Sequence, residues 1–204
     1  MVELPLAHYR FHFRAEEGVN LPAFAGSAWR GAFGNALKRT LCVTRLTHCS
    51  SCPLLNSCAF PYLFEGRRPA DVEVLTGFER VSVPFALRPP TLGQRSVAPG
   101  DEVEIDVAVF GRANDRLIYI VHALAAAGER GVGPGRGRLS LQRAARLRLP
   151  DNVEAEPIFS EGCFHQPFPP ETPELRSTTF DSVTIHLHTP LRLTTEGKLI
   201  TPDG

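Results

Sequence analysis

The sequence predicts an α+β fold whose elements follow the order strand, helix, strand, strand, helix, strand. Apolar and polar residues alternate through the first 16 residues and again over 101–110, which is typical of strands with one buried face. Between them, residues 27–41 place apolar side chains three and four positions apart, the period of an amphipathic helix. A segment rich in cysteine, 42–64, is inserted after this helix.

The first strand and the first helix are predicted from the opening 41 residues. The two faces of the strand carry Ala7, Tyr9, Phe11 and Phe13 on one side and His8, Arg10, His12 and Arg14 on the other. Gly18–Pro22 ends this strand. The helix is expected over Ser27–Leu41, with Ser27 as its N-cap, because a serine side chain accepts hydrogen bonds from the free N–H groups of a first turn.

Two strands, a helix and a last strand are expected after the insertion. Phe78–Arg88 and Asp101–Phe110 alternate as strands do, Asn114–Glu129 has a helical period, and Arg138–Leu149 follows a glycine-rich turn. The complete order βαββαβ is that of the ferredoxin-like motif. In that topology the first strand lies between the third and the fourth.

The charges on two strands provide a check of this topology. The outer face of the first strand is basic, whereas that of the third carries Glu102, Glu104 and Asp106. Opposite charges on neighbouring strands stabilise a sheet by about 0.2–1 kcal/mol per cross-strand pair. The charges therefore favour the same neighbours as the βαββαβ order does.

The chain is expected to hold one complete domain and the start of another. Residues 1–149 form the first domain, and 150–176, which contain six prolines, are expected to be a connector. Within 177–204, Val183, Ile185 and Leu187 alternate with polar residues in the manner of the first strand. We expect this segment to be the first strand of an incomplete second domain in a truncated chain, and such an unpaired strand would favour a dimer.

Composition limits the classes of partner. Lysine plus arginine and aspartate plus glutamate both number 22, so the formal net charge is zero. An anionic partner would therefore need a local basic patch. No apolar run reaches the ~18–20 residues of a membrane span, and the N-terminus lacks a signal-peptide pattern. A cytoplasmic protein with no membrane partner is expected.

The polar side of the first helix is one predicted contact surface for RNA. It carries Ser27, Arg30, Gly31, Gly34, Lys38 and Arg39. A glycine inside a helix costs up to about 1 kcal/mol relative to alanine, so the two glycines indicate either close packing against a neighbour or the approach of an RNA backbone. Free N–H groups near the predicted N-cap would suit a phosphate.

The glycine-rich turn Gly131–Arg138 (GVGPGRGR) is the second predicted contact surface. Its RNA-binding residues are expected to be Gly133, Gly135, Arg136, Gly137 and Arg138. Exposed backbone N–H groups beside two guanidiniums suit a phosphate. A dinucleotide-binding loop is excluded, since such a loop follows a strand and opens a helix. A flexible turn with solvated arginines is the other interpretation.

Four of the five cysteines lie in the insertion and predict a structural metal site. Cys42, Cys49, Cys52 and Cys58 have the spacing C-x6-C-x2-C-x5-C. Four thiolates suit zinc or an iron–sulfur cluster and leave no open coordination position for catalysis. Free thiols or disulfides are the alternative, and His48 is a possible replacement for one cysteine ligand.

Cleavage of RNA without a metal requires three chemical groups. A base takes the 2′-OH proton, an acid protonates the leaving 5′-oxygen, and a cation stabilises the phosphorane. The catalytic residues stay unassigned, with Lys38, His12 and Tyr9 as the candidates. A solvated or cross-strand-paired role is the more usual one for a single histidine on an outward strand face.

Four segments, in order, resemble the CRISPR-associated endoribonuclease family of the RAMP superfamily, which cuts repeat RNA. They are LPLAHYRFHFRA, LPAFAGSAWRGAFGNALKR, CSSCPLLNSCAFPYLFE and GVGPGRGR. The resemblance implies two tandem ferredoxin-like, RRM-like RAMP domains that bind RNA across them and serve antiviral defence. It also implies metal-independent cleavage of precursor CRISPR RNA within its repeats, which leaves 2′,3′-cyclic phosphate ends and requires no cofactor.

The resemblance further implies a catalytic group, often a histidine, on or near the first helix. Relatives close to this sequence read GAFGHAL, whereas Gly31–Leu37 reads GAFGNAL here. Asn35 cannot transfer a proton as a histidine does, so no catalytic histidine is carried over. The glycine-rich loop of the family belongs to its C-terminal domain, and Gly131–Arg138 would be the counterpart in the first domain.

Three functions remain open from the sequence. The first and leading one is a repeat-processing ribonuclease, inactive as this fragment, and the match of the first 65 residues to repeat-processing relatives favours it. The second, favoured by Asn35, is a non-catalytic RAMP subunit that binds guide RNA beside other subunits of a CRISPR effector complex. The third is a metal-stabilised interaction module with no role toward RNA.

Overall fold

A computed structural model describes residues 4–72, 77–89, 93–149 and 151–173, with a few positions beyond them. The chain forms two compact units, Met1–Pro173 and Glu174–Gly204. In the second unit, the described residues include a two-stranded antiparallel pair, β9 (Thr194–Thr195) and β10 (Lys198–Leu199). Val183 lies outside any strand, and Ile185 and Leu187, on which the predicted alternation depends, lie outside the described residues.

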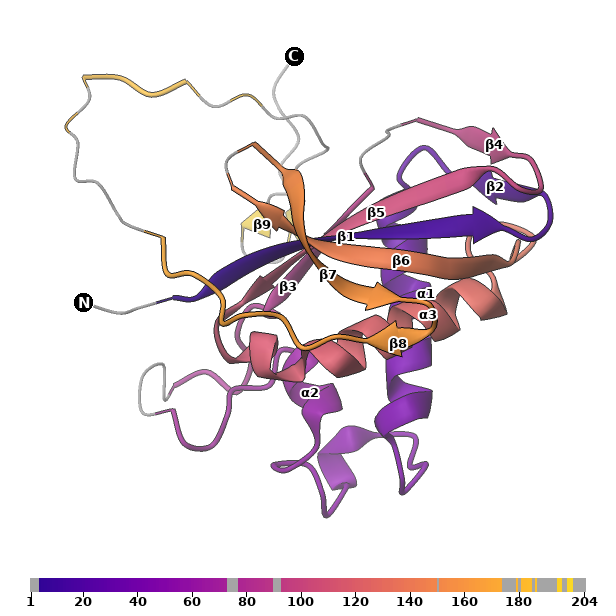
Figure 1. Cartoon of the computed structure of the whole chain (residues 1–204). Coiled ribbons are helices and arrows are strands. Elements are labelled where there is room, and N and C mark those ends of the chain that lie inside the picture. Colours follow the sequence, from indigo (N-terminus) through magenta and orange to yellow (C-terminus); the bar gives the residue numbers. More distant parts are fainter. Residues whose placement is uncertain are drawn as a thin grey trace. The chain divides into compact units, whose positions relative to one another are not determined.

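The first unit is built on a six-stranded antiparallel sheet with the order β3-β5-β1-β6-β7-β8 (Figure 1). Its strands are β1 (Leu6–Ala15), β3 (Phe85–Arg88), β5 (Glu102–Phe110), β6 (Leu139–Arg148), β7 (Val153–Ser160) and β8 (Cys163–Phe164). The first strand thus lies between the third and fourth strands of the predicted motif. This confirms the predicted strand order and the α+β class.

The predicted charge pairing between strands is confirmed by the register. Across β1 and β5, Arg10 lies opposite Asp106, and His12 lies opposite Glu104. Arg14 lies opposite Glu102 at the end of the ladder. These side chains alternate with the apolar ones that face the core, so the outer face of the sheet carries the charges.

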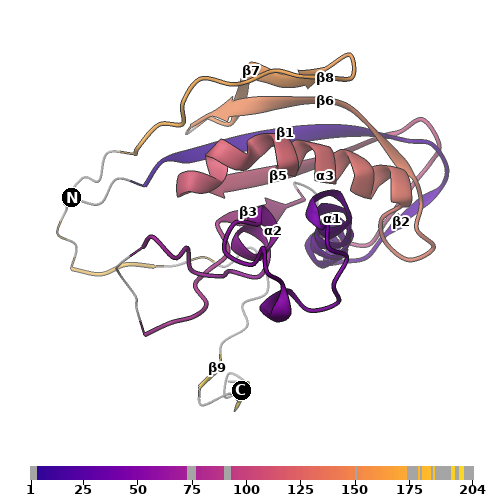
Figure 2. The same cartoon turned by 90° about the horizontal axis from the view of Figure 1, so that it is seen from below.

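Two helices cover the other face of the sheet and enclose the core (Figure 2). They are α1 (Ala25–Leu41) and α3 (Leu117–Arg130), which follows the 3-10 turn η2 (Gly111–Arg116). Trp29 of α1 is fully buried and its ring centroid lies 4.9 Å from that of Phe13 on β1. Among the described residues, no helix has the length and hydropathy needed to cross a membrane.

Short elements complete the unit at its two ends. β2 (Val19–Leu21) and β4 (Arg95–Val97) form a separate antiparallel pair beyond the main sheet. The cysteine-rich insertion contains the 3-10 turn η1 (Cys49–Ser51) and the short helix α2 (Ala59–Leu63).

The helix start predicted at Ser27 was wrong. Helix α1 begins at Ala25, with Phe24 as its N-cap and no side-chain cap. The Ser27 hydroxyl donates a hydrogen bond of 2.9 Å to the Phe24 carbonyl, so it is a residue of the first turn. The second helix was predicted over Asn114–Glu129. The structure has the 3-10 turn η2 up to Arg116, and the α-helix itself runs from Leu117 to Arg130.

The predicted strand Phe78–Arg88 is shorter than expected. Only Phe85–Arg88 joins the sheet, because Pro84 has no N–H to donate to the ladder. The backbone before it pairs elsewhere: the Arg68 N–H donates to the Glu79 carbonyl, and the Val81 N–H donates to the Gly66 carbonyl.

The connector predicted at 150–176 contains two strands of the sheet. β7 pairs with β6 and β8 pairs with β7, through a turn in which Glu161 and Gly162 both have positive φ. Pro157 is accommodated beside a register shift between Ala144 and Ala145. A proline is tolerated at such an irregularity, so proline content alone did not distinguish a strand from a linker.

Candidate nucleic-acid interface

A cavity of about 600 Å³ lies between α1, the end of α3 and the glycine-rich turn. We call it the basic groove and define it by Ala28, Ala32, Asn35, Arg39, Arg130, Gly133 and Arg136, which are among its lining residues. The two predicted contact surfaces, the first helix and the turn, meet here.

The groove forms along one stripe of α1. Ala28, Ala32, Asn35 and Arg39 follow one another at steps of four, three and four, which places them on the same helix face. A different face of the helix carries the buried Trp29, Phe33 and Leu37. The two alanines have short side chains, so the stripe leaves open space in front of Asn35.

The glycine-rich turn forms the second wall of the groove. Gly131 and Gly133 have φ of +94° and +76°, and a Cβ at either position would overlap a carbonyl oxygen, that of Arg136 or of Asn20. A Cβ at Gly137 would lie 2.8 Å from the Gly18 carbonyl oxygen and from the Cα of Val19. These glycines thus permit a tight turn seated against residues 18–20, whereas Gly135 faces open space.

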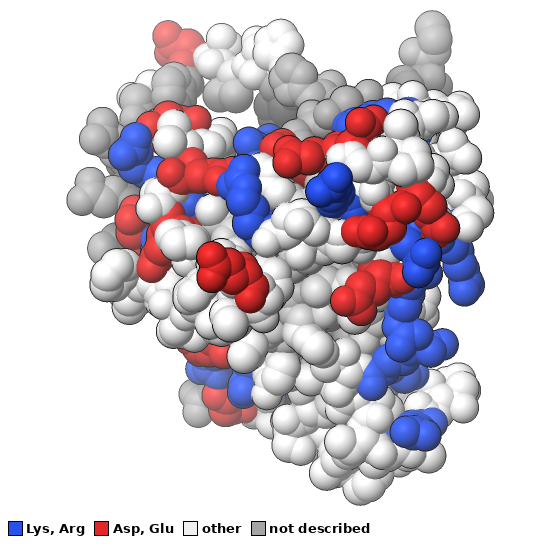
Figure 3. All heavy atoms as spheres, turned by 45° about the vertical axis from the view of Figure 1, so that its right-hand side comes forward, with Lys and Arg blue, Asp and Glu red and all other residues white. Residues whose placement is uncertain are grey.

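The groove has a positive charge that no acidic residue in its lining offsets. Arg39, Arg130 and Arg136 are exposed, and none of the three has an ion pair or a hydrogen bond from its side chain within the described residues. In the space-filling view, basic side chains gather in a band at the lower right, while acidic and basic side chains alternate above it (Figure 3). Unpaired guanidiniums on a concave surface are suited to phosphate groups.

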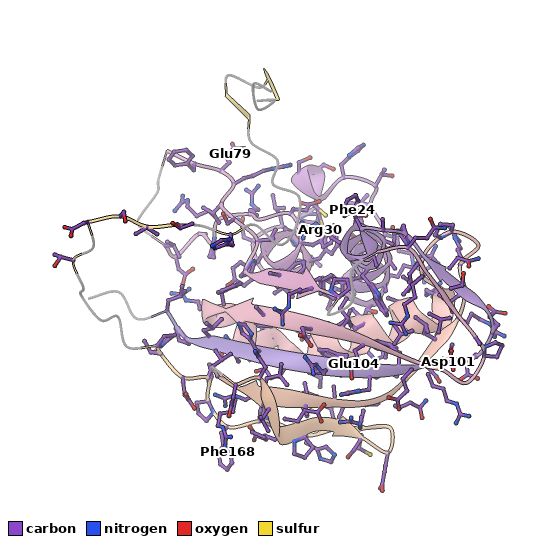
Figure 4. The ribbon with its side chains drawn as sticks, turned by 90° about the horizontal axis from the view of Figure 1, so that it is seen from above. Phe24, Arg30, Glu79, Asp101, Glu104 and Phe168 are labelled. Atoms are coloured by element: carbon purple, nitrogen blue, oxygen red, sulfur yellow. The ribbon has the colours of Figure 1, made fainter. Side chains whose placement is uncertain are left out.

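Three residues of the predicted helix surface lie away from the groove. The Arg30 guanidinium stacks 4.9 Å from the Phe64 ring and 5.2 Å from that of Phe85, between α1 and β3 (Figure 4). A Cβ at Gly34 would overlap the Phe64 ring, so this glycine serves close packing. Lys38 donates a 2.8 Å hydrogen bond to the Thr47 carbonyl. The insertion covers this side of α1, so of the two interpretations given for the glycines, close packing applies to Gly34.

The remaining predicted contacts are divided between open and paired positions. Gly31 has open space around it, and Ser27 is exposed in the first turn of α1. Arg138 donates two hydrogen bonds to the Glu17 carboxylate, one of 3.0 Å from its backbone N–H and one of 3.3 Å from its Nε. The structure therefore brings Arg39, Gly133 and Arg136 together and leaves Arg138 in an ion pair.

The catalytic candidates on β1 do not face the groove. Tyr9 is buried in the core, where its hydroxyl lies 3.5 Å from Oδ1 of Asn114 and burial raises its pKa to about 12. His12 lies on the outer face of the sheet, where its Nε2 is 2.5 Å from Glu154 and its Nδ1 is 3.3 Å from Glu104. Each of these side chains is held by partners within the fold.

The outer face of the sheet is a network of paired charges rather than a basic surface. Arg10 donates two hydrogen bonds to Asp106, at 2.7 and 3.0 Å, and Arg88 donates a third at 2.8 Å. Burial opposes ionisation of Asp106, but the hydrogen bonds from the two arginines outweigh it and lower the pKa of this carboxyl. Glu104 lies on the same face (Figure 4).

The four cysteines of the insertion line one small apolar cavity of about 20 Å³. All four carry free thiols, and Thr44 lies between two of them, with its hydroxyl 3.8 Å from Cys42 and 3.4 Å from Cys52. Within the described residues, no three His, Cys, Asp or Glu side chains are grouped as around a metal ion. The donor set fits a thiolate-binding metal, although its side chains do not form a closed shell.

Two groove residues were not predicted as contacts by sequence reasoning. Arg130 is the last residue of α3 and directly precedes Gly131. Its place beside the glycine-rich turn in the sequence could have identified it as a contact residue. Asn35 was noted only for its difference from related sequences. The stripe of small residues at 28 and 32, followed by 35 and 39, is the pattern that places it in a groove.

Comparison with known proteins finds a matching family, a related protein and similar solved structures, of which one is described here. The family model AF_1859_N, described as an N-terminal domain, matches residues 4–172. A protein of Archaeoglobus fulgidus, which bears the name "Uncharacterized protein", is 28% identical over 113 residues. That match spans 55% of this chain and 37% of the relative.

The solved structure is a chain of the Csm3–Csm4 subcomplex in the type III-A CRISPR-Cas interference complex. It aligns with a TM-score of 0.45 and 12% identity, over 78% of this chain and 93% of that chain. A likeness at this level assigns neither a fold family nor a function.

Proposed function

We propose that this chain, which belongs to the AF_1859_N N-terminal domain family, binds single-stranded RNA along the basic groove and holds it without cutting it. The observation that carries the proposal is the cluster of Arg39, Arg130 and Arg136 around a cavity whose lining has no acidic residue. A chain with zero net charge can attract a polyanion only through such a local concentration of charge.

The identity of the RNA is proposed from the sequence. Four segments resemble CRISPR-associated repeat endoribonucleases of the RAMP superfamily, and two of them, the first helix and the glycine-rich turn, form the walls of the groove. We therefore take the RNA to be a CRISPR repeat or guide RNA. The partners would be other subunits of a CRISPR effector complex.

Binding without cleavage is supported by one of the residues that line the groove. Asn35 lines it and cannot act as a general base or acid, because an amide side chain does not titrate near neutral pH. The other candidates are engaged elsewhere: Lys38 with the Thr47 carbonyl, His12 with two glutamates, and Tyr9 in the core.

Metal-independent cleavage of precursor CRISPR RNA is the second candidate function. It is favoured by the resemblance of the first 65 residues to enzymes that leave 2′,3′-cyclic phosphate ends. The Asn35→His variant tests whether a single substitution makes the groove cleave RNA, since it adds a titratable imidazole to the lining that holds the three arginines.

A structural metal is proposed for the cysteine-rich segment. Cys42, Cys49, Cys52 and Cys58 would hold a zinc ion or an iron–sulfur cluster, and the group would join the end of α1 to the segment that leads into α2. It would have no part in binding RNA, since none of the four residues lines the basic groove.

The test uses labelled repeat RNA in a buffer that contains EDTA. Fluorescence anisotropy measures binding, and a denaturing gel with an assay for cyclic phosphate ends measures cleavage. We expect binding with no product from the natural chain. A single EDTA-resistant cut would replace the binding proposal with the ribonuclease, and absence of binding at low salt would refute both.

A further inference from the structure

A second cavity, of about 260 Å³, lies away from the basic groove and shares no lining residue with it. Its walls come from three segments: residues 55–62 at the end of the insertion, 67–71, and the end of η2. Of the four cysteines proposed to hold a metal, only Cys58 lines this cavity, so the metal site does not account for it.

Four arginines line this cavity, and only part of their hydrogen-bonding capacity is used. Arg67 and Arg116 have no ion pair or side-chain hydrogen bond within the described residues. Arg112 pairs with Asp71, and Arg68 donates to the Val72 carbonyl from Nη1.

One of these arginines has a buried donor without a partner. In the described residues, the Nε of Arg68 is shielded from solvent and makes no hydrogen bond. An atom closed to water is closed to a ligand as well, so Arg68 contributes its positive charge to the cavity, and this Nε is not one of the donors that would contact the ligand.

The charges and the hydroxyl groups of the lining favour one kind of ligand. The four arginines exceed the two aspartates, Asp71 and Asp115, by two positive charges. Burial raises the pKa of Tyr62, so its hydroxyl keeps its proton at neutral pH and can donate a hydrogen bond. A phosphate monoester carries about −1.5 to −2 at pH 7 and has three acceptor oxygens, which matches both properties.

The geometry points to a binding site for a phosphate monoester in this cavity, held by Arg67, Arg68 and Arg116. The volume lies just below the ~300–1,000 Å³ of pockets for drug-sized ligands, so only a small molecule or the end of a longer one fits. The two sources are a free nucleoside monophosphate and the terminal phosphate of an RNA.

The experiment is isothermal titration with 5′-AMP, with adenosine as the uncharged control. We expect 5′-AMP to bind with Kd of about 1 mM or tighter and adenosine not to bind. The variant Arg67→Gln/Arg116→Gln should bind 5′-AMP at least tenfold more weakly, since two guanidinium contacts are lost. The matched variant Arg39→Gln/Arg136→Gln, which alters the basic groove, should bind 5′-AMP unchanged.

A third variant distinguishes the loss of guanidinium contacts from a loss of folding, because it is expected to strengthen binding. Asp115→Asn removes a negative charge from the lining and should tighten binding about threefold. Affinity for a 5′-phosphorylated RNA above that for its 5′-hydroxyl form, lost in Arg67→Gln/Arg116→Gln, would assign the site to RNA ends. Equal affinity for the two RNAs with binding of 5′-AMP would assign it to a free nucleotide.

Two results would overturn the inference. One is the absence of measurable 5′-AMP binding at several millimolar. The other is loss of binding in Arg39→Gln/Arg136→Gln but not in Arg67→Gln/Arg116→Gln, which would place the phosphate in the basic groove. Failure of the groove variant to weaken RNA binding would refute the proposed function and leave this site untouched.

Discussion

Replacing Arg39, Arg130 and Arg136 together with alanine removes the three guanidiniums that line the basic groove. The three side chains are exposed and have no partner in the described part of the chain, so their loss should not disturb the fold. The effect should appear in RNA binding and, above all, in its dependence on salt.

The expected size of the effect comes from counterion release. For single-stranded nucleic acid, each phosphate neutralised by a protein cation adds about −0.7 to the slope of log K against log salt. Three contacts therefore predict a slope about 2 units steeper for the natural chain than for the triple variant. Between 50 and 200 mM salt, the natural chain should lose about 20-fold more affinity than the variant does.

The assay is fluorescence anisotropy with a labelled single-stranded repeat RNA at four or more salt concentrations. The control is Arg14→Ala/Arg45→Ala/Arg80→Ala, which removes the same charge from exposed positions outside the groove. We expect the control to keep the slope of the natural chain. Equal slopes for the natural chain and the groove variant, or an equal loss in the control, would refute the groove as the RNA-binding surface.

Three further predictions concern the stability of the fold. Metal analysis of the purified protein should find one bound structural site. The double variant Cys49→Ser/Cys52→Ser should lose the metal and unfold at a lower thermal midpoint. A natural chain that contains no metal and has the same thermal midpoint as the double variant would refute this. Asp106→Ala should cost about 1–3 kcal/mol in urea unfolding, since the half-buried Arg10 loses two hydrogen bonds and keeps only its 3.8 Å contact with Glu104. Because the pKa of folded Asp106 is lowered, its contribution is present above about pH 4 and is lost as pH falls further, so Asp106→Asn should flatten the acid limb of the stability curve. Gly34→Ala should destabilise the protein by about 1–3 kcal/mol in urea unfolding, because the new methyl group would overlap the Phe64 ring. Gly31→Ala lies in open space and should stabilise the protein by up to about 1 kcal/mol. Equal changes in the two variants would contradict the packing assigned to Gly34.

The sheet could be predicted because its determinants are local. Alternation defines which face of β1 is buried, and the opposite charges of Arg10 and Asp106 indicate which strands are neighbours. The length of β3 could not be predicted in the same way. Residues 79–81 also alternate, but their backbone groups pair with Gly66 and Arg68, and such a distant partner leaves no local pattern.

The site was predicted in part, for a related reason. The helical period of α1 separates its faces correctly, but it does not say which neighbour covers each face. Phe64, the last residue of the cysteine-rich insertion, covers Gly34 and stacks under Arg30. The two alanines at 28 and 32 leave their face open, and Arg39 is the one predicted helix cation on it.

The alternation of β1 also bears on the choice between holding RNA and cutting it. Tyr9 points into the core beneath the helices, and His12 points to the outer face of the sheet. The groove is made by the helices that cover the inner face, so the sheet itself separates His12 from any RNA bound there. Neighbouring residues of a strand face opposite sides of the sheet, so Tyr9 and His12 cannot both face the groove. A shift of the strand register by one residue would turn His12 inward, but it would also expose Phe11 and Phe13. Cleavage in this groove would therefore require a group on α1, α3 or the glycine-rich turn, and α1 presents Asn35 at that place.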